Sequence, residues 1–337
     1  MRTGLGEQIF SPGVQGDESS LLEKTEVAHF SEGNKKPSIL RKIIVFSVIL
    51  IIFFFLGKTL FRNLGEVSIH RWSLKPPLLI LSFLCVTINL AIASYAWKRI
   101  LSFFQITLPF EQSFKIMSAS GMGKYIPGKI WQYLSQIYLG QKVGLPKGVT
   151  FFSMVLLFVA YNLVGILLFL FSLFFWQRFS PFLISALLLL FISISSFIFY
   201  PPILNQAFKI LLHLFKKKSL PIKARFDQTL KLLLILIVDW LIFGIGVYLL
   251  VNSFYSINFD QTVILCGIFA ISVISGILSF FVPAGLGVRE GVQSYLLSLF
   301  LPISMAILIS LAMRVWMTLG ELACFLIALK IKKPKLT

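Results

Sequence analysis

The segment GKYIPGKIWQY, from Gly123 to Tyr133, places two lysines, a proline and two glycines inside a chain that is otherwise dominated by apolar residues. Of its 337 residues 57% are hydrophobic and only 13% are charged, whereas soluble domains carry about 25% charged residues. This composition predicts a membrane protein. The charged segment must therefore be interpreted with a lipid bilayer, rather than water, as the surrounding solvent.

Six stretches reach the length of about 20 mainly apolar residues that a transmembrane helix needs. They are Ile43 to Phe61, Pro77 to Trp97, Thr150 to Trp176, Pro181 to Tyr200, Leu230 to Val251 and Ile303 to Leu329. We therefore expect an all-α polytopic membrane protein with about six transmembrane helices. Residues 1–38 are polar and predict a disordered tail rather than a signal peptide. A membrane domain over residues 39–330 and a basic tail at 331–337 complete the expected organisation.

Lysine and arginine gather in blocks at the ends of these stretches, so the net charge of +18 does not indicate a nucleic-acid partner. The blocks are Lys35, Lys36, Arg41 and Lys42; Lys98 and Arg99; Lys209, Lys216, Lys217, Lys218, Lys223 and Arg225; and Lys330, Lys332, Lys333 and Lys335. The loop from Asn252 to Gln261 has neither residue type. By the positive-inside rule we expect both termini in the cytoplasm, in the cytoplasmic (inner) membrane, with anionic lipid headgroups near the basic blocks.

Two segments remain, Gln112 to Gly140 and Thr262 to Leu301. With this orientation, the first must begin and end on the cytoplasmic side of the membrane and the second on the outer side. Pro127 and Gly128 interrupt the first and leave arms of about 14 and 12 residues, roughly 20 Å each, in a ~30 Å hydrocarbon core. The residues that interrupt the second are Pro283, Gly285, Gly287 and Gly291. We expect two broken re-entrant hairpins in an inverted repeat, although full crossing by either segment stays open.

In transporters with such repeats, the substrate binds near the midplane, where broken helices meet. Lys124, Lys129 and Arg289 are therefore predicted to hold an anionic headgroup. The candidate substrate-binding residues are Lys124, Tyr125, Pro127, Gly128, Lys129, Gln132, Pro283, Gly285, Gly287, Arg289, Glu290, Arg314 and Glu321. An alternative stays open, in which the lysines reach toward the interface and the Pro-Gly breaks are ordinary loops.

Acidic residues in apolar surroundings point to the same region. Glu290 would cost about 2.5–3.5 kcal/mol at mid-bilayer and needs a partner. Arg314 and Glu321 are seven residues apart, on one helix face, so Arg314 can pair with Glu290, or with Glu321 through a bridging group. A static structural ion pair is equally compatible with this pattern. Asp239 is a further buried acid with no obvious local partner.

Several chemistries have no support in the sequence. Cys85, Cys266 and Cys324 lie in apolar segments and read as small buried hydrophobic residues. The three histidines share no ligand spacing, and nucleotide-binding and hydrolase motifs are missing from the sequence. We expect no metal, no cofactor and no catalytic residues.

Together with the second break, VPAGLGVREG, the segment GKYIPGKIWQY resembles the paired signatures of the lysylphosphatidylglycerol synthase transmembrane-region family. The resemblance covers roughly Ile43 to Lys330 and implies flippase-like lipid translocation. The residues that it points to are Gly123, Pro127, Gly128, Pro283, Gly285, Gly287 and Glu290. The two-part members carry an additional aminoacyl-transferase domain. Because the chain ends eight residues after Leu329, lysyl transfer is not expected.

Two classes of function remain open. The first is a lipid transporter or flippase for an anionic phospholipid or a polyprenyl-phosphate glycolipid. The second is an accessory membrane subunit or a membrane-embedded transferase in glycolipid or polysaccharide synthesis, which implies a lipid-modifying enzyme or glycosyltransferase as partner. Two cationic breaks in inverted arrangement favour the transporter.

Overall fold

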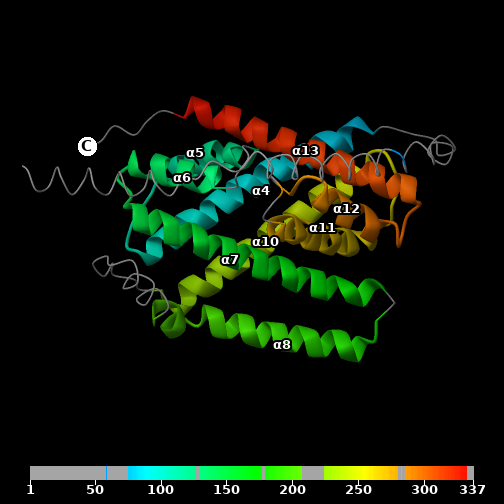
Figure 1. The fold of residues 1–337 in the computed structure, drawn as a ribbon, viewed down its shortest axis with the longest axis horizontal. Coiled ribbons are helices and arrows are strands. Elements are labelled where there is room, and N and C mark those ends of the chain that lie inside the picture. Colours follow the sequence, from blue (N-terminus) through cyan, green and yellow to red (C-terminus); the bar gives the residue numbers. More distant parts are fainter. Residues whose placement is uncertain are drawn as a thin grey trace, which may run out of the picture. The chain divides into compact units, whose positions relative to one another are not determined.

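A computed structural model describes Lys58 and residues 75–125, 130–176, 179–206, 224–279, 282 and 285–331. These residues form helices and no strands (Figure 1). The helices are α4 (Pro76–Phe103), α5 (Phe110–Gly121), η1 (Met122–Tyr125), α6 (Trp131–Gln141), α7 (Lys147–Ser172), η2 (Leu173–Trp176), α8 (Pro181–Phe199), α10 (Phe226–Asn252), α11 (Gln261–Leu278), α12 (Val288–Leu297) and α13 (Ile303–Lys330). The prediction of an all-α polytopic membrane fold is confirmed.

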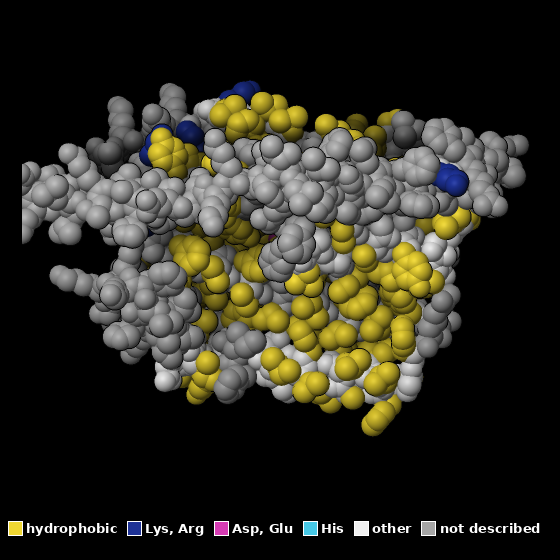
Figure 2. Space-filling view, in the orientation of Figure 1, with side chains coloured by type: hydrophobic (Ala, Val, Ile, Leu, Met, Phe, Trp, Pro, Cys, Tyr) yellow, Lys and Arg dark blue, Asp and Glu magenta, His cyan; other side chains and the backbone are white. Residues whose placement is uncertain are grey.

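Five of the six predicted spans coincide with helices α4, α7, α8, α10 and α13. The first, residues 43–61, lies outside the described residues, as do both terminal tails apart from Ile331. In the described part of the chain, five helices are long and apolar enough to cross a membrane: α4, α7 with η2, α10, α11 and α13. Hydrophobic side chains cover much of the described surface in Figure 2, as expected of helices that face lipid. On α8, for example, Phe182 is 84% exposed.

Each of the two interrupted segments folds as an antiparallel helical hairpin. In the first, Gly123 lies against the backbone of Gln132, and the Gln136 amide contacts the Met117 sulfur at 3.2 Å. In the second, Gly276 near the end of α11 meets Gly285. The chain then returns along α11, since Leu297 and Leu301 line the same apolar cavity as Ile257, Gln261, Ile264, Leu265, Ile268 and Phe300.

The two halves of the chain pack by the same scheme with their partners exchanged. If α4, α5, α6 and α7 are matched in order with α10, α11, α12 and α13, each contact in one half has a counterpart in the other. Helix α5 packs on α13 as α11 packs on α7, and α4 packs on α13 as α10 packs on α7. The most extensive contact joins α4 and α10, the one pair that the exchange maps onto itself. Helix α8 lies between the halves in sequence, beside α7 (Figure 1).

Glycine is required at both breaks because backbone approaches backbone there. A Cβ atom on Gly123 would lie 2.7 Å from the backbone nitrogen of Gln132. A Cβ on Gly285 would lie 2.7 Å from the Cα of Gly276, and Gly285 also has a φ of +66°. Gly287 has a φ of +84°, in the left-handed region that favours glycine. Both breaks thus depend on a residue without a side chain.

These contacts predict that alanine at either close approach destabilises the protein. Gly123→Ala and Gly285→Ala should each lower the free energy of unfolding by about 1–3 kcal/mol, from overpacking and, at Gly285, from backbone strain. Gly121→Ala and Gly291→Ala are matched controls, since a Cβ on either meets nothing within 4 Å. Thermal denaturation of the purified protein in detergent should show lower melting temperatures for the first pair only. Equal melting temperatures in all four variants would contradict this account of the breaks.

Candidate functional site

One face of α13 makes polar contacts with both hairpins. Its residues recur at spacings of three and four and therefore lie on one side of the helix. They are Ser310, Met313, Arg314, Met317, Thr318 and Glu321. We call this set the α13 stripe. Both hairpins contact it, the first through η1 and the second through α12.

The first hairpin contacts the stripe through η1. Lys124 forms an ion pair with Glu321. The Tyr125 hydroxyl lies 2.8 Å from Glu321 Oε2 and 3.2 Å from Thr318 Oγ1. Glu321 is buried, with 7% of its side chain exposed, whereas the Lys124 side chain is 31% exposed. The carboxylate is thus held by one cation and one hydroxyl at the edge of a partly open site.

The second hairpin contacts the stripe through the first turn of α12. Glu290 accepts a hydrogen bond from the backbone N–H of Gly287 at 2.6 Å and so caps the helix that contains it. Its other carboxylate oxygen lies 3.5 Å from the guanidinium of Arg314. The Ser310 hydroxyl donates to the Glu290 carbonyl at 3.1 Å. The structure therefore selects Glu290 as the direct partner of Arg314, one of the two pairings that the sequence left open.

Arg289 points to a different set of neighbours. Its guanidinium lies over the Phe269 ring, 4.4 Å from the centroid, and contacts the Met317 sulfur at 2.9 Å. It is buried, at 8% exposed, and interacts electrostatically with Arg314, Glu290, Glu321 and Tyr125. Arg289 thus adds positive charge to the same cluster, and it forms no ion pair with a carboxylate among the described residues. Arg314, which is half-buried, is the more accessible arginine.

The two hairpins approach the middle of α13 from its opposite ends. In the first, Lys115 Nζ donates to the carbonyl of Ile331 just beyond the helix, and Lys124 reaches Glu321, nine residues before the helix end at Lys330. In the second, Glu290 reaches Arg314, 11 residues after the helix start at Ile303. The tips of both hairpins therefore meet α13 between residues 314 and 321, near its centre.

The predicted site residues have three outcomes. The structure brings Lys124, Tyr125, Arg289, Glu290, Arg314 and Glu321 into one cluster on the α13 stripe. Gly285, Gly287 and Gln132 lie beside it, where Gly285 and the Gln132 backbone form close approaches and Gly287 is the N-cap of α12. Pro127, Gly128, Lys129 and Pro283 lie outside the described residues, so their predicted role is untested.

Sequence reasoning missed two members of the cluster, Met317 and Thr318. Their signal was present, because they lie between Arg314 and Glu321 at helical spacing and so share the face of the two charged residues. The specific role of Tyr125 as a second partner of Glu321 was also missed. A tyrosine next to Lys124 gives no indication of which distant carboxylate it will reach.

Chemically, two of the three cations in the cluster, Lys124 and Arg314, are already paired with carboxylates. Ion pairs with little exposure pay a large desolvation cost, so each carboxylate that loses its cation must gain a new partner or a proton. An anionic group that enters beside Lys124 and Arg314 would compete with Glu321 and Glu290 for the same cations. The arrangement is suited to binding an anion reversibly, because the site already contains the groups that replace it.

Two comparisons with known proteins bear on this arrangement. The family model described as lysylphosphatidylglycerol synthase TM region matches residues 39–322 of the chain. A search among curated proteins finds no match. The matched region contains both breaks and the α13 stripe as far as Glu321. The chain therefore belongs to the lysylphosphatidylglycerol synthase transmembrane-region family.

Proposed function

We propose that the protein is a lipid transporter that moves an anionic phospholipid or polyprenyl-phosphate glycolipid between the leaflets of the membrane. One observation carries the proposal: the tips of two broken hairpins meet two ion pairs at the centre of a helix long enough to cross the bilayer. Charged side chains at such a depth are costly and are a mark of substrate pathways. Family membership, with its often flippase-like members, supports the same reading.

The hairpins are proposed to be re-entrant. Helices α5, α6 and α12 have 12, 11 and 10 residues, which corresponds to about 15–18 Å each, half of a ~30 Å hydrocarbon core. Helix α11 is longer, with 18 residues or about 27 Å, so the second hairpin is the less symmetric one. The approach of the two hairpins from opposite ends of α13 and the exchanged packing of the halves support an inverted repeat. With the basic blocks inside, both termini are cytoplasmic.

The transported headgroup is proposed to bind by exchanging ionic partners. Its phosphate takes Lys124 from Glu321 and Arg314 from Glu290, with Arg289 adding to the positive potential. In the empty site the carboxylates return to the cations, which gives the two states different electrostatic partners, as a ligand-driven shift requires. Beside the first break, α6 exposes Trp131, Tyr133, Leu134 and Tyr138. This apolar and aromatic face suits acyl or polyprenyl chains that stay in the bilayer while the headgroup enters.

The first prediction of the proposed function concerns the topology of the two hairpins. Single cysteines at the exposed positions Glu111 and Gln141 should react with a membrane-impermeant maleimide from the cytoplasmic side. Cysteines at the exposed positions Asp260 and Pro302 should react from the outer side. The parent chain, labelled in parallel, corrects for its three native cysteines. Labelling of Glu111 and Gln141 from opposite sides would show a crossing segment and remove the inverted repeat.

The second prediction separates headgroup binding from structural pairing. Lys124→Gln should weaken binding of short-chain phosphatidylglycerol roughly tenfold to a hundredfold, since a hydrogen bond to a charged group contributes about 1.5–3 kcal/mol. It should also slow the flipping of fluorescent phosphatidylglycerol in liposomes. Lys142→Gln is the matched control, because Lys142 is exposed at the end of the same hairpin and faces Tyr138.

The double variant Lys124→Gln with Glu321→Gln decides whether Lys124 holds the phosphate of the headgroup or only neutralises Glu321. It removes both charges, so thermal stability should recover toward the parent because no carboxylate is left unpaired. Lipid binding and flipping should stay impaired if Lys124 holds the phosphate. Recovery of flipping together with stability would show that Lys124 serves only to neutralise Glu321. An accessory subunit or transferase would bind lipid in the parent without flipping it.

A further inference from the structure

The α10 helix contains a buried acid that the headgroup site does not use. Asp239 lies 13 residues after the start of α10 at Phe226 and 13 before its end at Asn252. It is 0% exposed, and neither carboxylate oxygen has a hydrogen-bond partner at standard geometry among the described residues. The sequence-based prediction that Asp239 is a buried acid is confirmed. Its position at the centre of a membrane-crossing helix needs an explanation.

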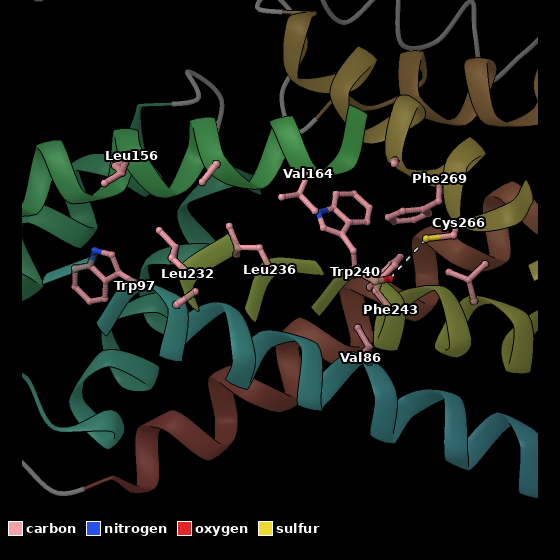
Figure 3. Close-up of a cluster of buried hydrophobic side chains, with 14 of the residues drawn as sticks. Val86, Trp97, Leu156, Val164, Leu232, Leu236, Trp240, Phe243, Cys266 and Phe269 are labelled. Carbon is pink, nitrogen blue, oxygen red and sulfur yellow. Dashed lines mark hydrogen bonds between the residues drawn. The ribbon is translucent and has the colours of Figure 1, made fainter. Parts of the chain in front are cut away.

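The groups that face Asp239 are uncharged. Asn89 from α4 donates to the Asp239 backbone carbonyl at 3.3 Å, and the Asn89 amide and the Tyr161 hydroxyl from α7 interact with the carboxyl group. From α11, Cys266 contacts the Trp240 carbonyl at 3.6 Å, the dashed line in Figure 3. Helix α13 meets α10 through Trp316, which packs on Phe243. Among the described residues, the titratable side chains on this side are thus Tyr161 and Cys266, both neutral at pH 7.

An ionised carboxylate is costly in such surroundings. Without a cation to pair with, a buried carboxylate would pay most of its desolvation cost, and such groups take up a proton instead. The apolar packing next to it is dense, with Leu236, Trp240 and Val164 drawn around the same segment in Figure 3. In the conformation described, Asp239 therefore has no cation to pair with among the described residues. Ionisation requires a second conformation that admits water or a cation.

We propose that Asp239 is a proton-binding site that couples lipid transport to the proton gradient, an inference that rests on the proposed transport function. Asp239 takes up one proton from one aqueous phase in one state and releases it to the other phase in the second state. Each transport cycle then moves one proton with one lipid. The lipid site and the proton site are separate, since the first lies on α13 and the second on α10.

A chain of direct contacts links the two sites through α11. Phe243, one turn after Asp239, packs on Phe269 with ring centroids 4.2 Å apart. Phe269 in turn lies under the Arg289 guanidinium. A movement of α10 that exposes Asp239 and carries Phe243 with it acts directly on the ring on which Arg289 rests. Proton release and a change in the cationic cluster are mechanically connected by these two contacts.

The repeat explains why a single proton is expected. Asn89 lies 13 residues after the start of α4 at Pro76, the same offset that Asp239 has in the matching helix α10. The two residues touch where α4 packs on α10. One half of the repeat thus carries an acid and the other its neutral amide analogue. One titratable carboxyl at this contact supports one proton per cycle.

Transport against a pH gradient tests the proposal directly. The purified chain in phosphatidylglycerol liposomes should distribute labelled lipid unequally between leaflets when the two sides differ by one pH unit. One proton per lipid would give a leaflet ratio of up to about tenfold, because one pH unit corresponds to about 1.4 kcal/mol. Asp239→Asn should reduce this ratio to one, because an amide can neither take up nor release the proton. Asp227→Asn is the matched control, since Asp227 lies on the same helix with 52% of its side chain exposed.

Infrared spectroscopy detects protonation of the Asp239 carboxyl group independently of any transport measurement. The parent at pH 7 should show the C=O stretching band of a protonated carboxylic acid, which Asp239→Asn loses and Asp227→Asn keeps. If Asp239→Asn does not fold, Asp239→Leu gives the same comparison. A parent that moves no lipid under any condition would overturn the proposed function and the coupling, while the band still decides whether Asp239 holds a proton.

Three results would overturn the proton site. They are an unchanged band in Asp239→Asn, an unchanged leaflet ratio in Asp239→Asn, and a ratio in the parent that follows a sodium gradient instead of the pH gradient. A ratio of one in the parent with active flipping would also contradict the coupling and leave the transport function standing.

Discussion

The pairing of four charged side chains on and around one face of α13 is the constraint on which the rest of the structure depends. Lys124 with Glu321 and Arg314 with Glu290 bring together residues that are far apart in sequence. Each charge would be costly alone in apolar surroundings, so both hairpins must reach the same part of α13. The two breaks in the chain are the means by which they do so.

The backbone at each break is adapted to this requirement. Gly123 and Gly285 let two backbone segments approach more closely than a side chain would allow, which returns the chain along the helix it has just left. The return directs Lys124 and Glu290 at α13 from its opposite ends. Around this centre, α4 and α10 pack against each other as the matched pair of the two halves. The proposed proton site lies at that second contact, and α11 connects it to the first.

Much of this architecture could be predicted from the sequence because hydrophobic length and Pro-Gly interruptions are local signals. Five predicted spans and both interrupted segments correspond to helices and hairpins of the structure. The sequence left two partners open for Arg314, Glu290 and, through a bridging group, Glu321. The position of Arg314 on a helix face shows which side chains it can reach but not which one it pairs with. The Lys124–Glu321 pair depends on how the two halves pack together, and the place of Arg289 on Phe269 depends on how α12 folds back on α11. Such long-range contacts leave no periodic signal in the sequence.

The most direct test of the central claim is an experimental structure of the protein in nanodiscs that contain phosphatidylglycerol. The account predicts phosphate density between Lys124 and Arg314, with Glu321 and Glu290 turned away from these cations, and the acyl chains running out past α6. A structure in detergent without added lipid should keep both ion pairs. Headgroup density elsewhere, with Lys124–Glu321 and Arg314–Glu290 intact in the presence of bound lipid, would contradict the account.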